Sequence, residues 1–311
     1  MRRFRQAFFW VIATVVGTLA LDRILAGLAG PLPPVVAGRV ETVETDAGVV
    51  SVVESGDPKG APVVLVHGLH LGAGSYEFGR LAGALPDSNR YLFVDLPGFG
   101  RSGRPSTSYD VETMVDALES VISARTETPP IVVASGQSVP IAFEAAQRTD
   151  ARRVIAIGPR TEIGTSRPVL GSLLSVPIVG TAVYLALTSR PLLADHLEQY
   201  LEVSAELATD TLLDGAWCAA HQPGSYAGPG AWLAGDLDTL RGLDTIIEEF
   251  DGDVALVAGD RSIRPTLATV RKVAAGTGAS LSVVHGTRAI PHLSAPTAVA
   301  DHLVQEELLA A

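Results

Sequence analysis

Short apolar runs rich in β-branched residues recur along the chain and alternate with stretches of helix-forming composition. Such runs suit the strands of a parallel sheet, because both faces of that sheet are buried. Strands alternating with helices at this spacing predict an α/β fold, with a mostly parallel sheet and helices on both faces. Two further runs flank a turn sequence at 46–48 and predict a hairpin. The predicted core strands cover residues 62–66, 90–95, 131–134, 152–158, 253–259 and 281–284, and the predicted helices include 75–85, 110–123 and 140–146.

One predicted strand-to-helix turn carries a candidate nucleophile. The strand at 131–134 is followed by the pentapeptide Gly-Gln-Ser-Val-Pro at 136–140. This G-x-S-x-P sequence differs in its last residue from the G-x-S-x-G nucleophile elbow, in which a sharp turn lifts a serine hydroxyl clear of the sheet. Pro140 removes one N–H group, but the amide of Val139, next to Ser138, is retained. The alternative is an ordinary strand-to-helix turn with an incidental serine.

The N-terminus combines basic and apolar residues. Arginines at positions 2, 3 and 5 precede an uncharged apolar run over 7–21, and a second apolar run covers 24–32. The first run is short for a spanning helix, which needs about 20 residues. We expect a membrane anchor that either spans the bilayer or lies in its interface. A cleaved signal peptide and a buried N-terminal helix are the alternatives.

Composition and charge exclude several classes of partner and of protein. The 311 residues carry a net charge of -11, and no cluster of Lys and Arg lies beyond the N-terminus, which argues against nucleic acid. A hydrophobic content of 47% excludes a disordered chain. The single cysteine, Cys218, excludes an internal disulfide and provides no metal cluster. We expect neither a metal nor a cofactor.

Three motifs, taken in order, resemble those of the α/β-hydrolase superfamily, and of serine esterases and lipases in particular. They are Val-Leu-Val-His-Gly at 64–68, Asp-Leu-Pro-Gly-Phe-Gly-Arg-Ser at 95–102, and the turn at 136–140. The resemblance resumes near Val254 and covers about two thirds of the chain. It implies the α/β-hydrolase fold, in which a helical cap is inserted into the core.

The resemblance also implies roles for particular residues. The two amides of the family's oxyanion hole, which stabilise the charge of an acyl-transfer intermediate, fall at Val139 and at or beside Leu69. His67 corresponds to a histidine that shapes the loop. The segment at 168–189 carries no charge, so we expect apolar cap helices over the mouth of the site, or a cap that touches no substrate. The implied organisation is an anchor and linker at 1–34, a core at 35–159 and 251–311, and a cap at 160–250.

The acid and histidine positions of the family's catalytic triad are substituted in this chain. The acid position holds Ser262, and the histidine position, whose register follows from the two prolines after it, holds Ala289. A serine hydroxyl is a weak nucleophile without a base, so these substitutions predict a loss of activity. In the alternative, the loop is rearranged, His292 serves as the base for Ser138, and Asp260 orients His292.

Two functions therefore stay open. The first is a membrane-associated, esterase-like serine hydrolase that acts on an apolar acyl substrate. The second is a catalytically impaired hydrolase-fold protein that binds an apolar ligand or a partner. The expected partners are an apolar small molecule or acyl ligand and a membrane.

Overall fold

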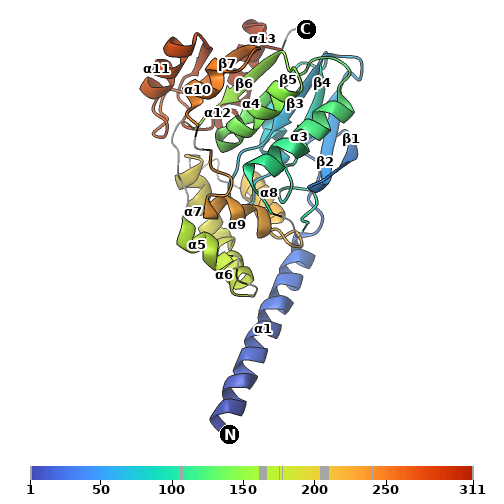
Figure 1. Cartoon of the computed structure of the whole chain (residues 1–311), viewed down its shortest axis with the longest axis vertical. Helices are drawn as coiled ribbons and strands as arrows, with labels where there is room; N and C mark the ends of the chain where they lie inside the picture. The colour runs from blue at the N-terminus through green and yellow to red at the C-terminus, as the bar shows by residue number, and fades with distance from the viewer. Residues whose placement is uncertain are drawn as a thin grey trace.

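The computed structural model describes residues 2–309 apart from 106–107, 161–166, 175, 177, 204–209 and 240. In this part of the chain, eight strands form one sheet in the order β1-β2-β4-β3-β5-β6-β7-β8 (Figure 1). The pairs β1–β2 and β2–β4 are antiparallel, and the others are parallel. The predicted hairpin and mostly parallel sheet are thus confirmed. The strands are β1 (Arg39–Thr45), β2 (Gly48–Gly56), β3 (Pro62–Val66), β4 (Arg90–Val94), β5 (Ile131–Ser135), β6 (Arg153–Ile157), β7 (Asp253–Gly259) and β8 (Ser280–Val284).

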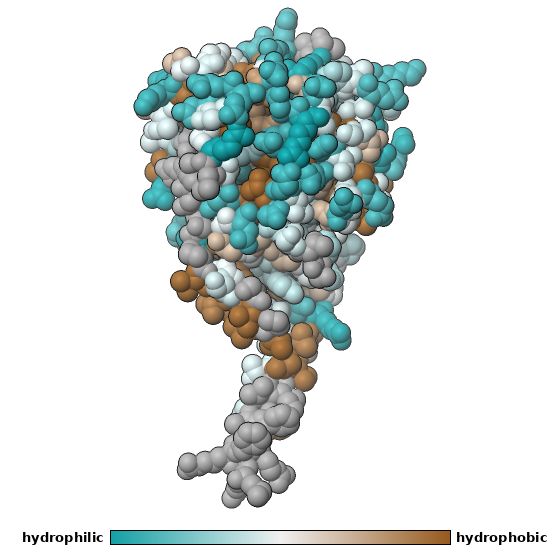
Figure 2. All heavy atoms as spheres, viewed as in Figure 1, coloured by the Kyte–Doolittle hydropathy of each residue, from teal (hydrophilic) through white to brown (hydrophobic). Residues whose placement is uncertain are grey.

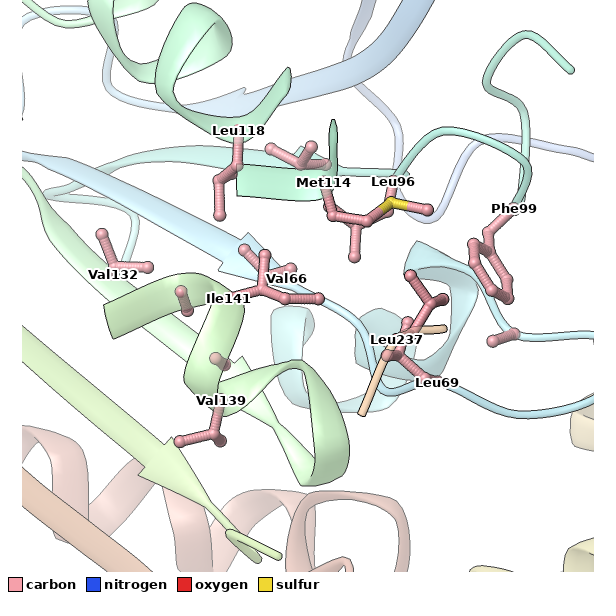
Figure 3. Packing of buried hydrophobic residues seen from close by; sticks show 14 of the residues in the cluster. Val66, Leu69, Leu96, Phe99, Met114, Leu118, Val132, Val139, Ile141 and Leu237 are labelled. Carbon is pink, nitrogen blue, oxygen red and sulfur yellow. The ribbon is translucent and has the colours of Figure 1, made fainter. Parts of the chain in front are cut away.

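Each core strand sends its side chains alternately into two buried layers. In β3, Val64 and Val66 face the layer that contains α3 and α4, which Figure 3 shows from close by. Val63 and Leu65 face the opposite layer, which contains α2 and α13. Because both layers are closed, every residue of β3 is buried, and the strand reads as a continuous apolar run. The helices around the sheet are α2 (Gly79–Ala82), α3 (Val111–Arg125), α4 (Val139–Arg148), α10 (Leu243–Glu248), α11 (Leu267–Thr277), α12 (Pro291–Ser294) and α13 (Pro296–Gln305).

One predicted helix is shorter than expected. The sequence predicts a helix over 75–85, whereas the structure has the 3-10 turn η1 (Ser75–Phe78) followed by the short α2. Gly79 and Gly83 lie at the two ends of α2. Glycine lowers helix stability because it loses the most backbone entropy, so packing against the sheet holds only a short element here.

The described residues between β6 and β7 are mostly helical, and we call the segment 160–250 the insertion. The uncharged stretch 168–189 contains two separate helices, α5 and α6, which contact each other, and it does not form one long helix. Figure 1 shows the insertion helices α5 to α9 gathered at one end of the sheet. Besides α10, they are α5 (Pro168–Leu174), α6 (Val179–Leu187), α7 (Arg190–Tyr200), α8 (Asp210–Ala220) and α9 (Ala227–Ala234).

The insertion contacts the core at the carboxyl ends of the parallel strands. In the loop after β3, the amide of Leu71 donates a hydrogen bond to His196 Nε2 of α7 at 3.3 Å. In the loop after β7, the amides of Ile263 and Arg264 donate to the carboxylate of Glu202 at 3.0 and 3.1 Å. In open α/β sheets, ligands bind at this edge.

The N-terminal helix α1 (Arg2–Ala29) projects away from the rest of the molecule (Figure 1). Several of its described apolar side chains are exposed, with Phe9 at 63% and Trp10 at 68%, so the alternative of a buried N-terminal helix is wrong. Near its C-terminal end, α1 contacts α6 and α8. Among the described residues, no helix combines the length and apolar character required to cross a membrane.

Candidate active site

The turn between β5 and α4 places Ser138 differently from a nucleophile elbow. The residue directly after β5 is Gly136, whose φ of +60° lies in the left-handed region. Ser138 follows two residues later with a φ of −77° and a ψ of −8°, in the ordinary right-handed region. Its side chain is fully buried, and its Oγ donates a hydrogen bond to the carbonyl oxygen of Ser135 at 2.9 Å. The hydroxyl therefore points back into the turn.

The strained position of the turn is thus occupied by glycine. In an elbow, the nucleophile itself occupies the strained residue between strand and helix. The sequence analysis assigned that position to Ser138, whereas the backbone geometry assigns it to Gly136. A β-carbon at Gly136 would lie 3.7 Å from Ile290 Cδ1, an ordinary contact, so the position has room for a side chain.

The loop after β8 brings the substituted histidine position beside this turn. Ala289 and Ile290 are both buried, and Ile290 is the neighbour of Gly136. The same loop also lies close to Gly158, at the end of β6. A β-carbon added at Gly158 would be 2.0 Å from the carbonyl oxygen of Ala289. Ala289, at the histidine position, is therefore the chain neighbour of Ile290, the residue that borders Gly136.

His292 is placed behind the site, in α12. Its ring stacks on Phe78 with a centroid distance of 4.8 Å, and the side chain is fully buried. Neither ring nitrogen has a hydrogen-bond partner among the described residues. Burial lowers the pKa of His292 to about 4 although Glu77 opposes the shift, so the ring is neutral at pH 7. The hydrogen bond that the alternative arrangement requires, from Ser138 Oγ to a ring nitrogen of His292, is not formed.

Asp260 and Ser262, in the loop after β7, also do not contact His292. The Asp260 carboxylate accepts hydrogen bonds from His285 Nδ1 at 3.1 Å and from the amide of Gly286 at 2.7 Å. The bond from His285 lowers the pKa of Asp260. Ser262 Oγ, at the acid position, is buried and has no partner among the described residues. The structure therefore does not assemble the relay of Ser138, His292 and Asp260.

The two predicted oxyanion residues are both fully buried. Val139 is the first residue of α4, and Leu69 lies in the loop after β3. Because Gly136 holds the strained position, the amide that follows that position belongs to Gln137 and not to Val139. His67 shapes the loop as expected, since its Nε2 accepts a hydrogen bond from the amide of Leu96 at 3.1 Å.

A buried ion pair in the same loop was missed by the sequence analysis. His70 Nε2 and Glu77 Oε1 are 2.7 Å apart, and both side chains are fully buried. Burial alone raises the pKa of Glu77, but the charge and hydrogen bond of His70 lower it below its ordinary value. Only the curling of the loop over η1 brings the two residues together, so the sequence holds no signal for the pair.

The insertion closes over the turn through Gln137, a residue that the sequence analysis passed over. Its Oε1 accepts hydrogen bonds from Tyr200 Oη of α7 and from Trp232 Nε1 of α9. The Tyr200 ring also stacks on His196, with a centroid distance of 5.1 Å. The side chain of the residue that follows the strained glycine is thus held by aromatic side chains of the insertion.

A cavity of about 570 Å³ lies on the outer side of this aromatic cover. Tyr200 and Trp232 belong to its wall, whereas Ser138 does not. The remainder of the wall comes mainly from the insertion, including Arg160, with Leu71 and Arg264 from the core loops. Ligand cavities in proteins typically have about 300–1,000 Å³, so this cavity has the size of a small-molecule site.

The sheet order, the strand-to-helix turn after β5 and the helical insertion after β6 define an α/β-hydrolase fold. Residues 63–302 match the sequence profile of the Alpha/beta hydrolase family. The match covers most of the chain, and the protein therefore belongs to that family.

Curated relatives match parts of the chain. The AB hydrolase superfamily protein YisY of Bacillus subtilis (strain 168) is 29% identical over 155 residues, which are 48% of this chain and 57% of that protein. The abhydrolase domain-containing protein abhd-5.2 of Caenorhabditis elegans is 44% identical over 62 residues, which are 19% of this chain and 14% of that protein. The matches thus span less than two thirds of either relative.

Solved structures share the fold at low sequence identity. A serine hydrolase involved in carbazole degradation has a TM-score of 0.71 at 14% identity, over 88% of this chain and 100% of that one. An esterase from Thermogutta terrifontis has a TM-score of 0.65 at 17% identity, over 87% and 98%. A membrane phospholipase A has a TM-score of 0.64 at 18% identity, over 100% of both chains. At these identities the likeness concerns the fold alone.

Proposed function

We propose that this chain is a non-hydrolytic member of the family that binds a ligand in the insertion cavity. The observation that carries the proposal is the set of residues at the triad positions. Glycine occupies the strained residue of the turn, alanine the histidine position and serine the acid position. Glycine provides no nucleophile, and neither alanine nor serine can act as a base at pH 7.

Ser138 does not replace the missing nucleophile in this proposal. Its hydroxyl already donates a hydrogen bond to the backbone carbonyl of Ser135, which is too weak a base to remove the proton. The buried, neutral His292 makes no hydrogen bond to it. A hydroxyl without a base is a poor nucleophile, and triads act as a unit, so an isolated serine keeps little catalytic advantage.

Labelling with a fluorophosphonate probe tests this proposal, since the probe reacts with an activated serine. We expect the wild type to label no faster than Ser138→Ala, and His292→Ala to change nothing. A family member with an intact triad serves as the positive control. Brisk labelling of the wild type that is lost in both variants would overturn the proposal and restore the esterase-like hydrolase acting on an apolar acyl substrate.

We also propose that the protein works at a membrane surface. Support comes from the exposed apolar side chains of α1 and from further ones on the insertion, which lie at the same end of the molecule (Figure 1). Figure 2 shows apolar residues gathered at this end, beside the base of α1. The exposed apolar residues of the insertion include Val169, Leu173, Val176 and Val179. Contiguous apolar surface of this kind marks interaction sites, and basic residues at the start of α1 suit anionic lipids.

Co-sedimentation with phosphatidylglycerol vesicles measures this association. We expect the full chain to sediment with the vesicles, and the double variant Phe9→Ser with Trp10→Ser to bind at least about tenfold more weakly. The double variant Val40→Ser with Val49→Ser, which removes exposed apolar side chains from the far hairpin, is the matched control. Equal binding by all three proteins, or none by the wild type, would contradict the proposal.

A further inference from the structure

The insertion cavity combines a basic and an apolar part. Its wall contains Arg160 and Arg167 from the start of the insertion and Arg264 from the loop after β7. None of their guanidinium groups forms an ion pair with a carboxylate of a described residue. The protein as a whole is acidic, with a net charge of -11, so convergence of unneutralised arginines is a local property of this cavity.

Arg160 is held in place before any ligand arrives. Its Nη2 donates to the carbonyl oxygen of Tyr200 at 2.7 Å, and its guanidinium lies 4.5 Å from the centroid of the Tyr200 ring. Stacking and hydrogen bonding together fix the plane of the group. A pre-oriented guanidinium binds a carboxylate or phosphate at a low entropic cost.

The acidic residues of the cavity wall are already engaged elsewhere. Both carboxylate oxygens of Glu202 accept hydrogen bonds from the backbone amides at 263 and 264, and Asp195 accepts one from the side chain of Gln199. His196 is neutral, because burial and the neighbouring charges, including Arg167 and Arg160, lower its pKa to about 3. The three arginines outnumber the two carboxylates, so the described wall carries an excess of one positive charge.

The other part of the wall is hydrocarbon and aromatic. Leucine side chains from α5, α6, α7 and α9 line it together with Trp232. Such a surface gains free energy when it covers an apolar chain, at roughly 25 cal/mol per Å² of buried apolar area. A small hydrophilic anion would leave this surface uncovered.

We infer that the cavity binds an anionic amphiphile, whose carboxylate or phosphate head meets the arginines and whose hydrocarbon tail lies against the leucines. This inference rests on the proposed binding function and adds the chemical class of the ligand. Arg160, on its aromatic support, provides the fixed contact, and Arg167 and Arg264 provide charge at the exposed side of the cavity.

Isothermal titration of the full chain with four compounds tests this inference. We expect laurate and dodecyl phosphate to bind, the uncharged ester methyl laurate to bind at least about tenfold more weakly, and inorganic phosphate not to bind. The tighter of the two anions identifies the headgroup as carboxylate or phosphate. Raising the salt concentration should weaken binding of the anions and not of the ester.

Variants that remove the charge of one arginine show where the anionic head of the ligand binds. Arg160→Gln and Arg264→Gln should each weaken binding of the anions by about tenfold and leave binding of the ester unchanged. Arg271→Gln, which removes an exposed arginine of α11 outside the cavity, is the matched control. Arg264 is exposed, so its variant remains informative if Arg160→Gln folds poorly.

The outcomes separate this inference from the proposed function. Equal binding of laurate and its ester, tight binding of inorganic phosphate, no binding by either amphiphile, or unchanged affinity in both arginine variants would each overturn the inference. Release of laurate from methyl laurate by the wild type, detected by chromatography, would instead overturn the proposed non-hydrolytic function.

Discussion

The turn after β5 and the insertion cavity lie on opposite sides of one aromatic cover, and they differ in almost every property. The turn is closely packed, and Gly136, Ala289 and Ser262 occupy the positions from which the family's chemistry would come. The cavity is open, and it carries arginines, aromatic rings and leucines that the catalytic apparatus does not need. Under the proposed function, the site lacks the residues for hydrolysis, and the residues that would hold a ligand lie beside it.

Under the proposed function, the protein keeps the fold of the family without its catalytic residues. The parallel sheet, the buried His70–Glu77 pair and the His67 contact hold the site loops in position without any catalytic residue. A fold can keep its architecture while the function moves to another surface, since function depends on the side chains of a site.

The largest expected effect comes from rebuilding the triad. The triple variant Gly136→Ser, Ser262→Asp, Ala289→His places a nucleophile at the strained position and restores its partners. Because a positioned base contributes roughly 10²–10⁴-fold, we expect a gain of at least about 100-fold in p-nitrophenyl butyrate hydrolysis. The backbone strain of a serine with positive φ costs of order 1–3 kcal/mol of folding free energy.

Two controls make the rebuilt site decisive. The variant Gly136→Ala, Ser262→Asp, Ala289→His carries the same strain without a nucleophile and should stay inactive. Ala289→His alone should gain nothing, since the nucleophile position would still be glycine. A roughly tenfold gain in that single variant, lost on adding Ser138→Ala, would return the nucleophile role to Ser138 and remove the contrast.

A smaller effect should appear in the pH dependence of stability. The pKa of His292 is about 4 in the folded state, below its ordinary value of 6.5, so the unfolded chain binds the extra proton first as the pH falls. Stability is therefore retained above about pH 6.5 and lost toward pH 4, by about 2 kcal/mol between pH 7 and pH 5. His292→Leu should remove this share of the loss, as measured by urea unfolding at both pH values.

The exposed His285 offers the matched control for that measurement. His285→Gln, at a histidine whose side chain is 85% exposed, should not remove the share of the loss that comes from His292. If His292→Leu loses as much stability between pH 7 and pH 5 as the wild type does, His292 is not buried and neutral in solution, and its availability as a base is reopened.

The smallest expected effect concerns the aromatic cover itself. Tyr200→Phe removes one of the two hydrogen bonds to Gln137 and keeps the ring on which Arg160 and His196 stack. We expect a loss of about 1 kcal/mol in unfolding free energy and unchanged ligand affinity. Tyr226→Phe, at an exposed tyrosine, is the control, and the comparison is made by urea unfolding and titration with laurate. A large loss of affinity would show that the hydroxyl belongs to the ligand site.

Much of the architecture was predictable from the sequence, because it follows from local patterns. Continuous apolar runs mark strands buried on both faces, as in β3, and their alternation with helices leaves few topologies. The assignment of Ser262 and Ala289 to the acid and histidine positions, from the glycine and prolines around them, stays a prediction.

The identity of the strained residue was decided only by the tertiary structure. The spacing of G-x-S-x-P points to Ser138, but where the turn begins depends on where β5 stops pairing, and Ser135 still pairs with Ile157 of β6. The left-handed residue is therefore Gly136. Pairing between strands is a long-range property, and no local motif encodes it.

The cavity was likewise decided by the tertiary structure. Arg160 and Arg167 lie far from Arg264 in the sequence, and nothing in their local context distinguishes them from surface arginines. They meet because α7 and α9 fold back over the carboxyl edge of the sheet, where Tyr200 and Trp232 hold Gln137. The local pattern of apolar residues thus determined the elements, and their packing determined which charged side chains share one space.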